Sequence, residues 1–84
     1  MKSRALLFIV PFLMLACSIE KKAKKAFQLG KYQNSIDLYQ KVLATSPNNG
    51  RANYFIAESY RLSNRMKDAV PYYEKAGGAG RSGQ

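Results

Sequence analysis

Apolar positions follow two different patterns along this chain. Residues 5–16 form an almost unbroken apolar run, which one proline interrupts, and the run stops at Cys17. Beyond it, apolar residues recur three and four positions apart, as at Ile36, Tyr39 and Leu43, and this spacing places them on one face of a helix. The two patterns predict an apolar leader followed by amphipathic helices.

Glycine and proline divide the amphipathic part into units. Gly30 separates two stretches of helical periodicity, and the sequence Ser-Pro-Asn-Asn-Gly at 46–50 ends the second stretch, with an asparagine able to cap the next helix. The same plan recurs up to residue 76. Pro71 would break a helix interior, so the last helix is expected to begin near Met66 or Lys67.

The two units also resemble each other residue by residue. A shift of 34 positions sets residues 23–42 beside residues 57–76. The shift pairs Ala23 with Ala57, Ser35 with Ala69, Ile36 with Val70, Tyr39 with Tyr73, and Gly30 with Asn64. Glycine and asparagine are the residues that most readily adopt the left-handed conformation ending a helix. A period of 34 residues is that of the tetratricopeptide repeat.

Residues 20–76 resemble two tetratricopeptide units. The residues that carry the resemblance are Gly30, Tyr32, Ser35, Tyr39, Val42 and Pro47 in the first unit, and Ile56, Ala57, Tyr60, Ala69, Tyr73 and Ala76 in the second. The resemblance implies an all-α fold of two helical hairpins, a fragment of an α-solenoid, with unit 1 at 23–49 and unit 2 at 50–76. It also implies that Tyr39 and Tyr73 face inward from the second helix of each unit.

Two units are few for this architecture, because at least three are usually needed to bury a continuous core. We therefore expect the helical part to be only marginally stable. The glycine-rich residues 77–84 depart from the helix end and proline stop of a complete unit. They are interpreted as a flexible end, a linker towards further domains, or the mark of a truncated sequence.

Composition disfavours catalysis. The 84 residues contain no histidine and one cysteine, so histidine acid–base chemistry and a cysteine-based metal site are poorly supported, and neither an enzyme nor a cofactor is expected. Fourteen basic residues stand against five acidic ones. Nucleic acid would be a poor explanation of this charge if the chain is exported.

The first residues are typical of an export signal. Lys2 and Arg4 precede the apolar run of about twelve residues, which is shorter than the roughly 20 that span a membrane. A buried core helix is the alternative interpretation. The sequence Leu13-Met14-Leu15-Ala16-Cys17 resembles the lipobox of bacterial lipoproteins, although leucine is usual where Met14 stands. The resemblance implies a signal peptide at 1–16, cleavage after Ala16 and a lipid on Cys17.

Four lysines follow the predicted lipid-bearing residue. Lys21, Lys22, Lys24 and Lys25 either contact an anionic membrane surface or form a solvated helix face. Residues 17–22 are accordingly predicted to be the lipidated cysteine and a basic tether. Ser18 follows the cysteine and no acidic run is present, which by the sorting patterns of lipoproteins favours the periplasmic face of the outer membrane.

The tetratricopeptide resemblance assigns a binding surface to the first helix of each unit. It places Lys24, Phe27, Gln28, Tyr54, Glu58 and Arg61 on the concave face, where a periplasmic protein or peptide would bind. The alternative is ordinary solubilising surface, with Phe27 and Tyr54 partly in the core.

The chain is also similar to the N-terminal part of Bacteroidetes lipoproteins, some of which serve type IX secretion. The leading hypothesis is a membrane-anchored scaffold for an envelope assembly. The alternatives are a lipid-tethered spacer that carries further domains towards peptidoglycan, and an inner-membrane adaptor with an uncleaved signal.

Overall fold

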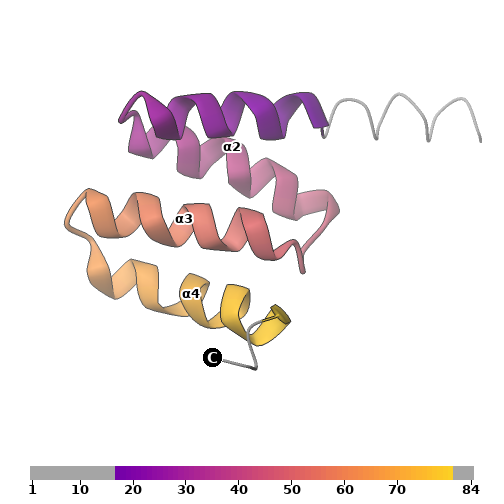
Figure 1. Cartoon of the computed structure of the whole chain (residues 1–84), viewed down its shortest axis with the longest axis vertical. Helices are drawn as coiled ribbons and strands as arrows, with labels where there is room; N and C mark the ends of the chain where they lie inside the picture. The colour runs from indigo at the N-terminus through magenta and orange to yellow at the C-terminus, as the bar shows by residue number, and fades with distance from the viewer. Residues whose placement is uncertain (1–16, 81–84) are drawn as a thin grey trace, which may run out of the picture.

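The described part of the chain consists of helices joined by short turns. The computed structural model describes the backbone of residues 17–80 and the side chains of residues 17–77. The predicted signal peptide and residues 81–84 lie outside it. Residues 17–28 are helical and are called the first helix, and they are followed by α2 (Tyr32–Thr45), α3 (Gly50–Leu62) and α4 (Met66–Gly80) (Figure 1). No strand occurs within residues 17–80. The all-α prediction is confirmed.

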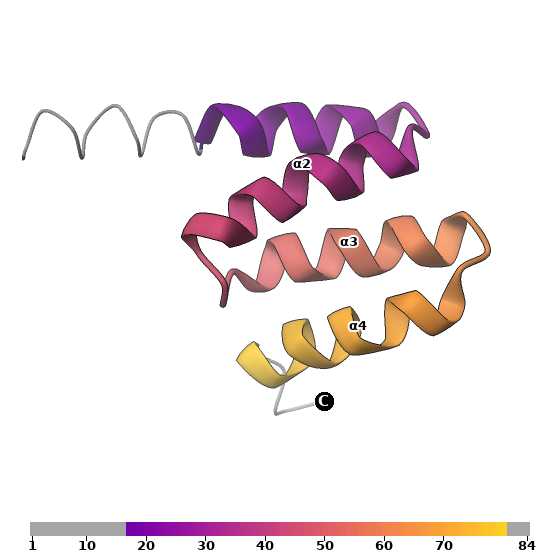
Figure 2. The ribbon, with the colours of Figure 1, turned by 180° about the vertical axis from the view of Figure 1, so that it is seen from behind.

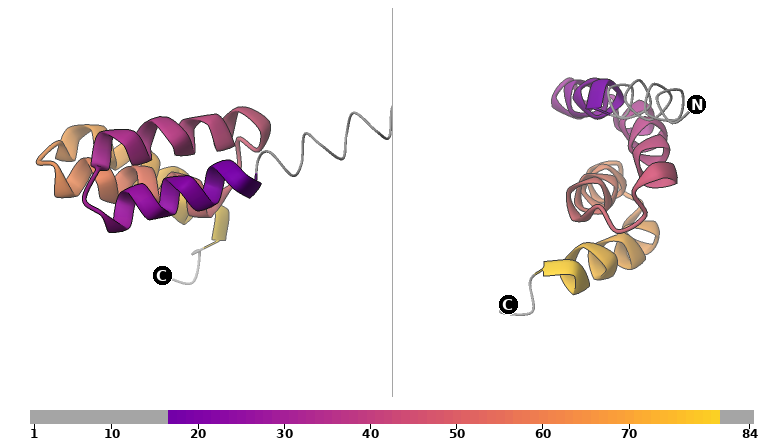
Figure 3. Two further views of the ribbon diagram at one scale, coloured as in Figure 1. Left: turned by 90° about the horizontal axis from the view of Figure 1, so that it is seen from above. Right: turned by 90° about the vertical axis from the view of Figure 1, so that its right-hand side faces the viewer.

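The four helices form two antiparallel hairpins stacked on each other. The first helix pairs with α2, and α3 pairs with α4 (Figure 1). Seen from behind, α2 lies in front of the space between the first helix and α3 (Figure 2). The side view places the first helix and α3 towards one side of the stack and α2 towards the other (Figure 3). The first helices of the two units therefore line one common face.

The same backbone motif closes both hairpins. In the first, Gly30 has a φ of 77°, its N–H donates to Phe27 at 3.0 Å, and the Lys31 N–H donates to Ala26 at 2.9 Å. In the second, Asn64 has a φ of 64°, and the N–H groups of Asn64 and Arg65 donate to Arg61 at 3.0 Å and Tyr60 at 2.8 Å. Both are Schellman motifs with a left-handed residue at the same position. The sequence pairing of Gly30 with Asn64 is confirmed.

The turn between the hairpins is held by asparagines. The Oδ1 atom of Asn49 accepts a hydrogen bond from the Ala52 N–H at 3.0 Å, which satisfies one of the free donors at the start of α3. The buried Asn53 donates through Nδ2 to the Asn49 carbonyl at 3.1 Å. These bonds fix the angle at which the second hairpin leaves the first.

The core lies between the hairpins. Its buried side chains are Ala23, Ile36, Tyr39, Val42, Ala52 and Ile56, with Ile19, Phe55 and Tyr72 among the partly buried residues packed against them. The Tyr39 ring stacks on Phe55, with centroids 5.5 Å apart and planes 8° from parallel. Ala57 and Ala69 are fully buried, and their small side chains let α3 and α4 approach closely. A hydrogen bond also joins the two hairpins: Gln40 Nε2 of α2 donates to the Tyr72 hydroxyl of α4 at 2.8 Å.

Two boundaries differ from the sequence prediction. Residues 17–22, predicted as a tether, belong to the first helix. Glutamate and lysine at positions 20–22 favour helix, and Ile19 packs against the core, which ties this segment to the fold. At the other end, α4 runs on to Gly80, four residues past the predicted end of unit 2. The sequence predicts an end at residue 76 because the following glycines have low helix propensity, but the helix continues through them.

Tyr73 also differs from its predicted position. Tyr39 is fully buried, as predicted, whereas Tyr73 is only partly buried. Tyr73 is less covered than Tyr39 because α4 has a neighbour on one side only: α3 packs against it, and no described helix lies on its other side (Figure 1).

Candidate functional site

The six predicted binding residues come from the first helix and α3, but they do not form one cluster. Tyr54, Glu58 and Arg61 lie at successive turns of α3 and contact each other or a shared neighbour, Tyr73 of α4. Lys24, Phe27 and Gln28 lie on the first helix, and each has a different environment. The α3 residues therefore form the better-defined half of the predicted face.

A hydrogen-bonded triad fixes the α3 side chains. Arg61 Nη2 donates to Glu58 Oε1 at 2.7 Å, and Arg61 Nε donates to the Tyr73 hydroxyl at 3.1 Å. The Tyr73 hydroxyl in turn donates to Glu58 Oε2. The donors from Arg61 hold the pKa of the Glu58 carboxyl below its usual value, despite some desolvation. Glu58 is thus ionised at neutral pH and serves to hold Arg61 and Tyr73 in place.

Burial and the neighbouring carboxylate act together on Tyr73. Desolvation raises the pKa of its phenol first, and the hydrogen bond to Glu58 raises that pKa further. The phenol therefore remains protonated and keeps its donor role in the triad. These hydrogen bonds hold the Glu58, Arg61 and Tyr73 side chains in fixed positions on the face of α3.

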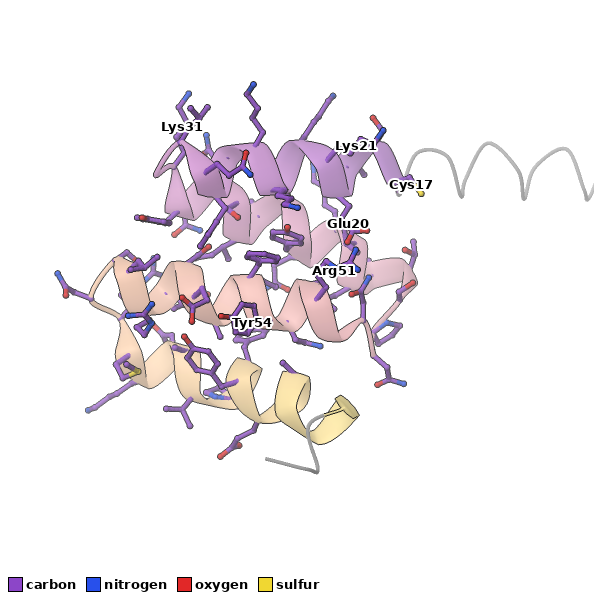
Figure 4. The ribbon with its side chains drawn as sticks, viewed as in Figure 1. Cys17, Glu20, Lys21, Lys31, Arg51 and Tyr54 are labelled. Atoms are coloured by element: carbon purple, nitrogen blue, oxygen red, sulfur yellow. The ribbon has the colours of Figure 1, made fainter. Side chains whose placement is uncertain are left out.

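Tyr54 lies beside the triad, and its ring is more exposed than that of Tyr73. Its side chain is 45% exposed. The ring contacts Phe55 edge-on at a centroid distance of 5.5 Å and Tyr73 at 6.1 Å. Figure 4 shows Tyr54 on the face of α3 that looks towards the viewer. Tyr54 therefore presents an exposed ring, packed against two other rings, close to the exposed Arg61.

Phe27 belongs to the packing between the hairpins. Its ring meets Phe55 edge-on at 5.0 Å and Tyr32 at 5.8 Å. It is partly buried, so it supports the face more than it projects from it. Gln28, one position along, is exposed. The alternative interpretation, in which Phe27 lies partly in the core, matches this geometry.

Lys24 faces a small polar pocket of about 270 Å³ between the first helix and α3. The other lining residues are Cys17, Glu20, Lys21, Tyr39 and Arg51. Glu20 and Arg51 point towards each other (Figure 4), and Arg51 Nη1 lies 3.4 Å from Glu20 Oε2. The Tyr39 hydroxyl is buried without a hydrogen-bond partner among residues 17–77. Burial first, and the Glu20 charge second, raises the pKa of Tyr39 to about 12.

Three residues of this face were missed from the sequence: Glu20, Arg51 and Tyr73. A signal for the first two existed, since the shift of 34 makes position 51 equivalent to position 17, and equivalent helices stack side by side. Arg51 therefore lies beside the turn of the first helix that carries Glu20. The sequence predicts Tyr73 as an inward-facing residue, and its role in the triad follows only from its hydrogen bonds to Glu58 and Arg61.

Two absences concern the described residues alone. No group of three or more His, Cys, Asp or Glu side chains among residues 17–77 could hold a metal ion. Within residues 17–80, no helix has both the length and the apolar character needed to cross a membrane.

Comparison with known proteins gives one finding. A family model described as "Tetratricopeptide repeat" matches residues 26–81, which is 56 of the 84 residues. Searches of curated proteins and of solved structures produced no match. The matched range begins near the end of the first helix and includes α2, α3 and α4. It therefore contains every predicted binding residue except Lys24.

Proposed function

The chain belongs to the tetratricopeptide repeat family, whose repeats bind other proteins, and we propose that it is a protein-binding scaffold attached to a membrane by a lipid on Cys17. Stacked repeats present an extended concave surface to their partners. The first helix and α3 supply that surface here. The partner in this proposal is a periplasmic protein or peptide, within an envelope assembly such as the type IX secretion machinery.

The observation that carries the binding proposal is the arrangement of Tyr54 and Arg61. Tyrosine and arginine, together with tryptophan, are enriched among the few side chains that dominate binding energies at interfaces. Arg61 is tied to Glu58 and Tyr73, and Tyr54 is held between Phe55 and Tyr73. Side chains already fixed in place lose less conformational freedom on binding, which favours affinity.

Attachment through Cys17 is supported by the sequence before it and by its place in the fold. The apolar run ends at Ala16-Cys17, in the pattern of a lipobox. Cys17 is a free, exposed cysteine on the first helix. Mass spectrometry of the mature protein tests the attachment: a diacylglyceryl group on Cys17 is expected, whereas an intact Met1 or an unmodified Cys17 would contradict it.

The proposed location is the periplasmic face of the outer membrane. Ser18 after the cysteine and the absence of an acidic run support this placement. Protease treatment of intact cells should leave the protein whole, and fractionation should recover it with the outer membrane.

Partner binding is tested by comparing two pairs of variants of the full chain. Tyr54→Ala and Arg61→Ala remove the proposed contact points, while Lys41→Ala and Lys67→Ala remove exposed side chains of α2 and α4 as controls. Proteins cross-linked to each variant in the cell envelope are then quantified. We expect a protein that is enriched with the wild type and the controls and reduced about 30-fold by each test variant, the effect of a strong interface residue. An unchanged set of captured proteins would overturn the proposal.

One observation favours a second function, that of a spacer carrying a following domain. Leu62, Met66 and Val70 are 42%, 51% and 45% exposed. Leu62 ends α3, Met66 begins α4, and Val70 lies one turn further along α4. Apolar side chains at the open end of a stack are suited to contact a further repeat or domain. In that case Tyr54→Ala and Arg61→Ala would leave every association intact, and Met66→Ser would not.

A further inference from the structure

A second surface lies on the opposite edge of the stack from α4. It is an open groove of about 580 Å³ between the first helix and α2. Its apolar part consists of Ala26, Leu29 and Leu38, and its basic side chains are Lys21, Lys22, Lys25 and Lys31. Figure 4 labels Lys21 near the start of the first helix and Lys31 in the turn that follows its end. Lys21 lines both this groove and the pocket that Glu20 and Arg51 share. We call this surface the lysine groove.

The charge of the lysine groove is strongly one-sided. Asp37 is the single acidic side chain lining it, and its carboxylate already accepts a hydrogen bond from Gln33 Nε2 at 3.0 Å. Within residues 17–77, none of the four lysines forms an ion pair. Their charges are therefore available to an anionic ligand.

One side chain in the apolar part of the groove is strongly exposed. Leu29 is 59% exposed, more than any other large hydrophobic side chain of the described residues. It lies at the turn that joins the first helix to α2, just before Gly30. An exposed leucine among lysines is the combination that amphipathic helices use at a membrane interface, where the leucine enters the headgroup region and the lysines meet phosphates.

We propose that the lysine groove is a contact site for anionic phospholipid and that the first helix lies along the membrane surface. A phospholipid surface supplies both a plane of phosphates and an apolar layer beneath it. The position of Cys17 favours this ligand over an acidic protein. Cys17 begins the first helix and Leu29 follows its last residue, about 18 Å away at 1.5 Å per residue. A lipid on Cys17, as in the proposed function, would bring the groove against the membrane.

The proposal separates the lysines of the predicted membrane contact into two sets. Lys24 does not line the groove and instead shares the polar pocket with Glu20 and Arg51. Lys31, which the sequence analysis did not include, joins the groove because the Gly30 turn brings it beside the first helix. With this edge on the membrane, α4 lies farthest from it and the face bearing Tyr54 stays accessible.

Vesicle binding tests the basic side chains. The full chain is made without lipidation and mixed with vesicles of phosphatidylcholine, with or without phosphatidylglycerol. The variant Lys21→Gln/Lys25→Gln/Lys31→Gln is compared with the control Lys41→Gln/Lys67→Gln/Lys75→Gln, which loses the same charge elsewhere. At about fivefold per lysine, the groove variant should bind anionic vesicles on the order of a hundredfold more weakly, while the control binds almost as the wild type does. Residues 1–16 are present in every variant, so their own affinity cancels.

A second comparison tests the apolar contact. Leu29→Ser should weaken binding several-fold, and Leu62→Ser, which removes an exposed leucine near the other edge, should not. Circular dichroism confirms that each variant is helical before its binding is compared.

Three outcomes would overturn the proposal. Equal losses in the two lysine variants would show that net charge alone drives binding. Unchanged binding in the groove variant would remove the groove from the contact. Capture of an acidic protein that depends on the groove, without vesicle binding, would identify a protein as its ligand. Because the chain is unlipidated here, these outcomes are independent of the test of Cys17 and of partner capture through Tyr54.

Discussion

At the scale of single residues, the fold depends on a few side chains that bridge the two hairpins. Tyr39 is the largest fully buried side chain, and it reaches from α2 to stack on Phe55 of α3. Tyr73 occupies the equivalent place in the second unit, but only one neighbouring helix covers it. Arg61 is exposed and contributes through its bonds to Glu58 and Tyr73. Tyr39 and Tyr73 are equivalent positions of the two units, but they contribute differently to the free energy of unfolding because neighbouring helices cover them to different extents.

This difference predicts an order of destabilisation. Tyr39→Ala should cost about 3–5 kcal/mol, the typical loss for a buried aromatic, and remove the cooperative transition altogether. Tyr73→Ala should cost less, since much of its ring is already solvated, and Arg61→Ala should cost no more than about 1 kcal/mol. Urea titration followed by circular dichroism measures all three. Equal effects would contradict the register of the repeats.

Tyr39→Phe is the matched control for that experiment. It keeps the ring and removes a buried hydroxyl that has no partner among the described residues. Because an unpaired buried polar group is unfavourable, this variant should be as stable as the wild type or more so. A clear loss of stability would mean that the hydroxyl has a partner in solution.

Some of these residues are predictable from the sequence and others are not, for a physical reason. The buried Tyr39 and the cap at Asn49 follow from local spacing and local hydrogen bonding. The Glu20–Arg51 pair and the triad around Glu58 depend on which side chains meet across helices. That information appears only once the stacking of the helices is known.

At the scale of elements, the two hairpins are the same motif built with different residues. Each turn requires one residue in the left-handed region, supplied by Gly30 in the first hairpin and Asn64 in the second. A Cβ added at Gly30 would meet no atom within 4 Å, so only the backbone conformation restricts this position.

The turn residues therefore predict two opposite changes in stability. Gly30→Ala should lower the free energy of unfolding by about 1 kcal/mol, because an L-residue is strained at this φ. Asn64→Gly should leave stability unchanged or raise it slightly, because glycine adopts the same φ without strain. The urea midpoint of each variant gives the answer. A neutral Gly30→Ala would show that the turn relaxes to another conformation.

The existence and order of the helices were predictable, whereas two of their ends were not. Periodicity and turn residues mark the middle of each helix clearly. Residues 17–22 are predicted as a tether because they follow the predicted lipid-bearing position and lead into the lysines, and the glycines after Ala76 are predicted as a flexible end or linker. In both places the chain is helical, and at the first the packing of Ile19 against the core ties the segment to the fold.

At the scale of the whole molecule, the described stack has two open edges. One is the lysine groove with Leu29, and the other carries Met66 and Val70. In a longer array each edge would be covered by a neighbouring unit. Each uncovered edge leaves apolar surface in water and forgoes the stabilisation that its burial would give.

We therefore expect the chain to unfold at a low denaturant concentration. Urea titration of the unlipidated protein should show substantial helical signal and a shallow transition, as for a domain near the lower limit of independent stability. Addition of anionic vesicles that cover the lysine groove should raise the midpoint. A sharp transition with a midpoint typical of a full-size domain would contradict this expectation.

The helical state of residues 17–22 has a consequence for how the protein would work on a membrane. A flexible leash lets a binding site explore a volume that grows with the length of the leash. Here Ile19 already packs against the core two residues after Cys17, so an anchor at that cysteine would have almost no slack. The face bearing Tyr54 would be confined to a thin layer next to the bilayer. Its effective concentration in that layer would be high, which would favour rebinding of any partner held in the same membrane.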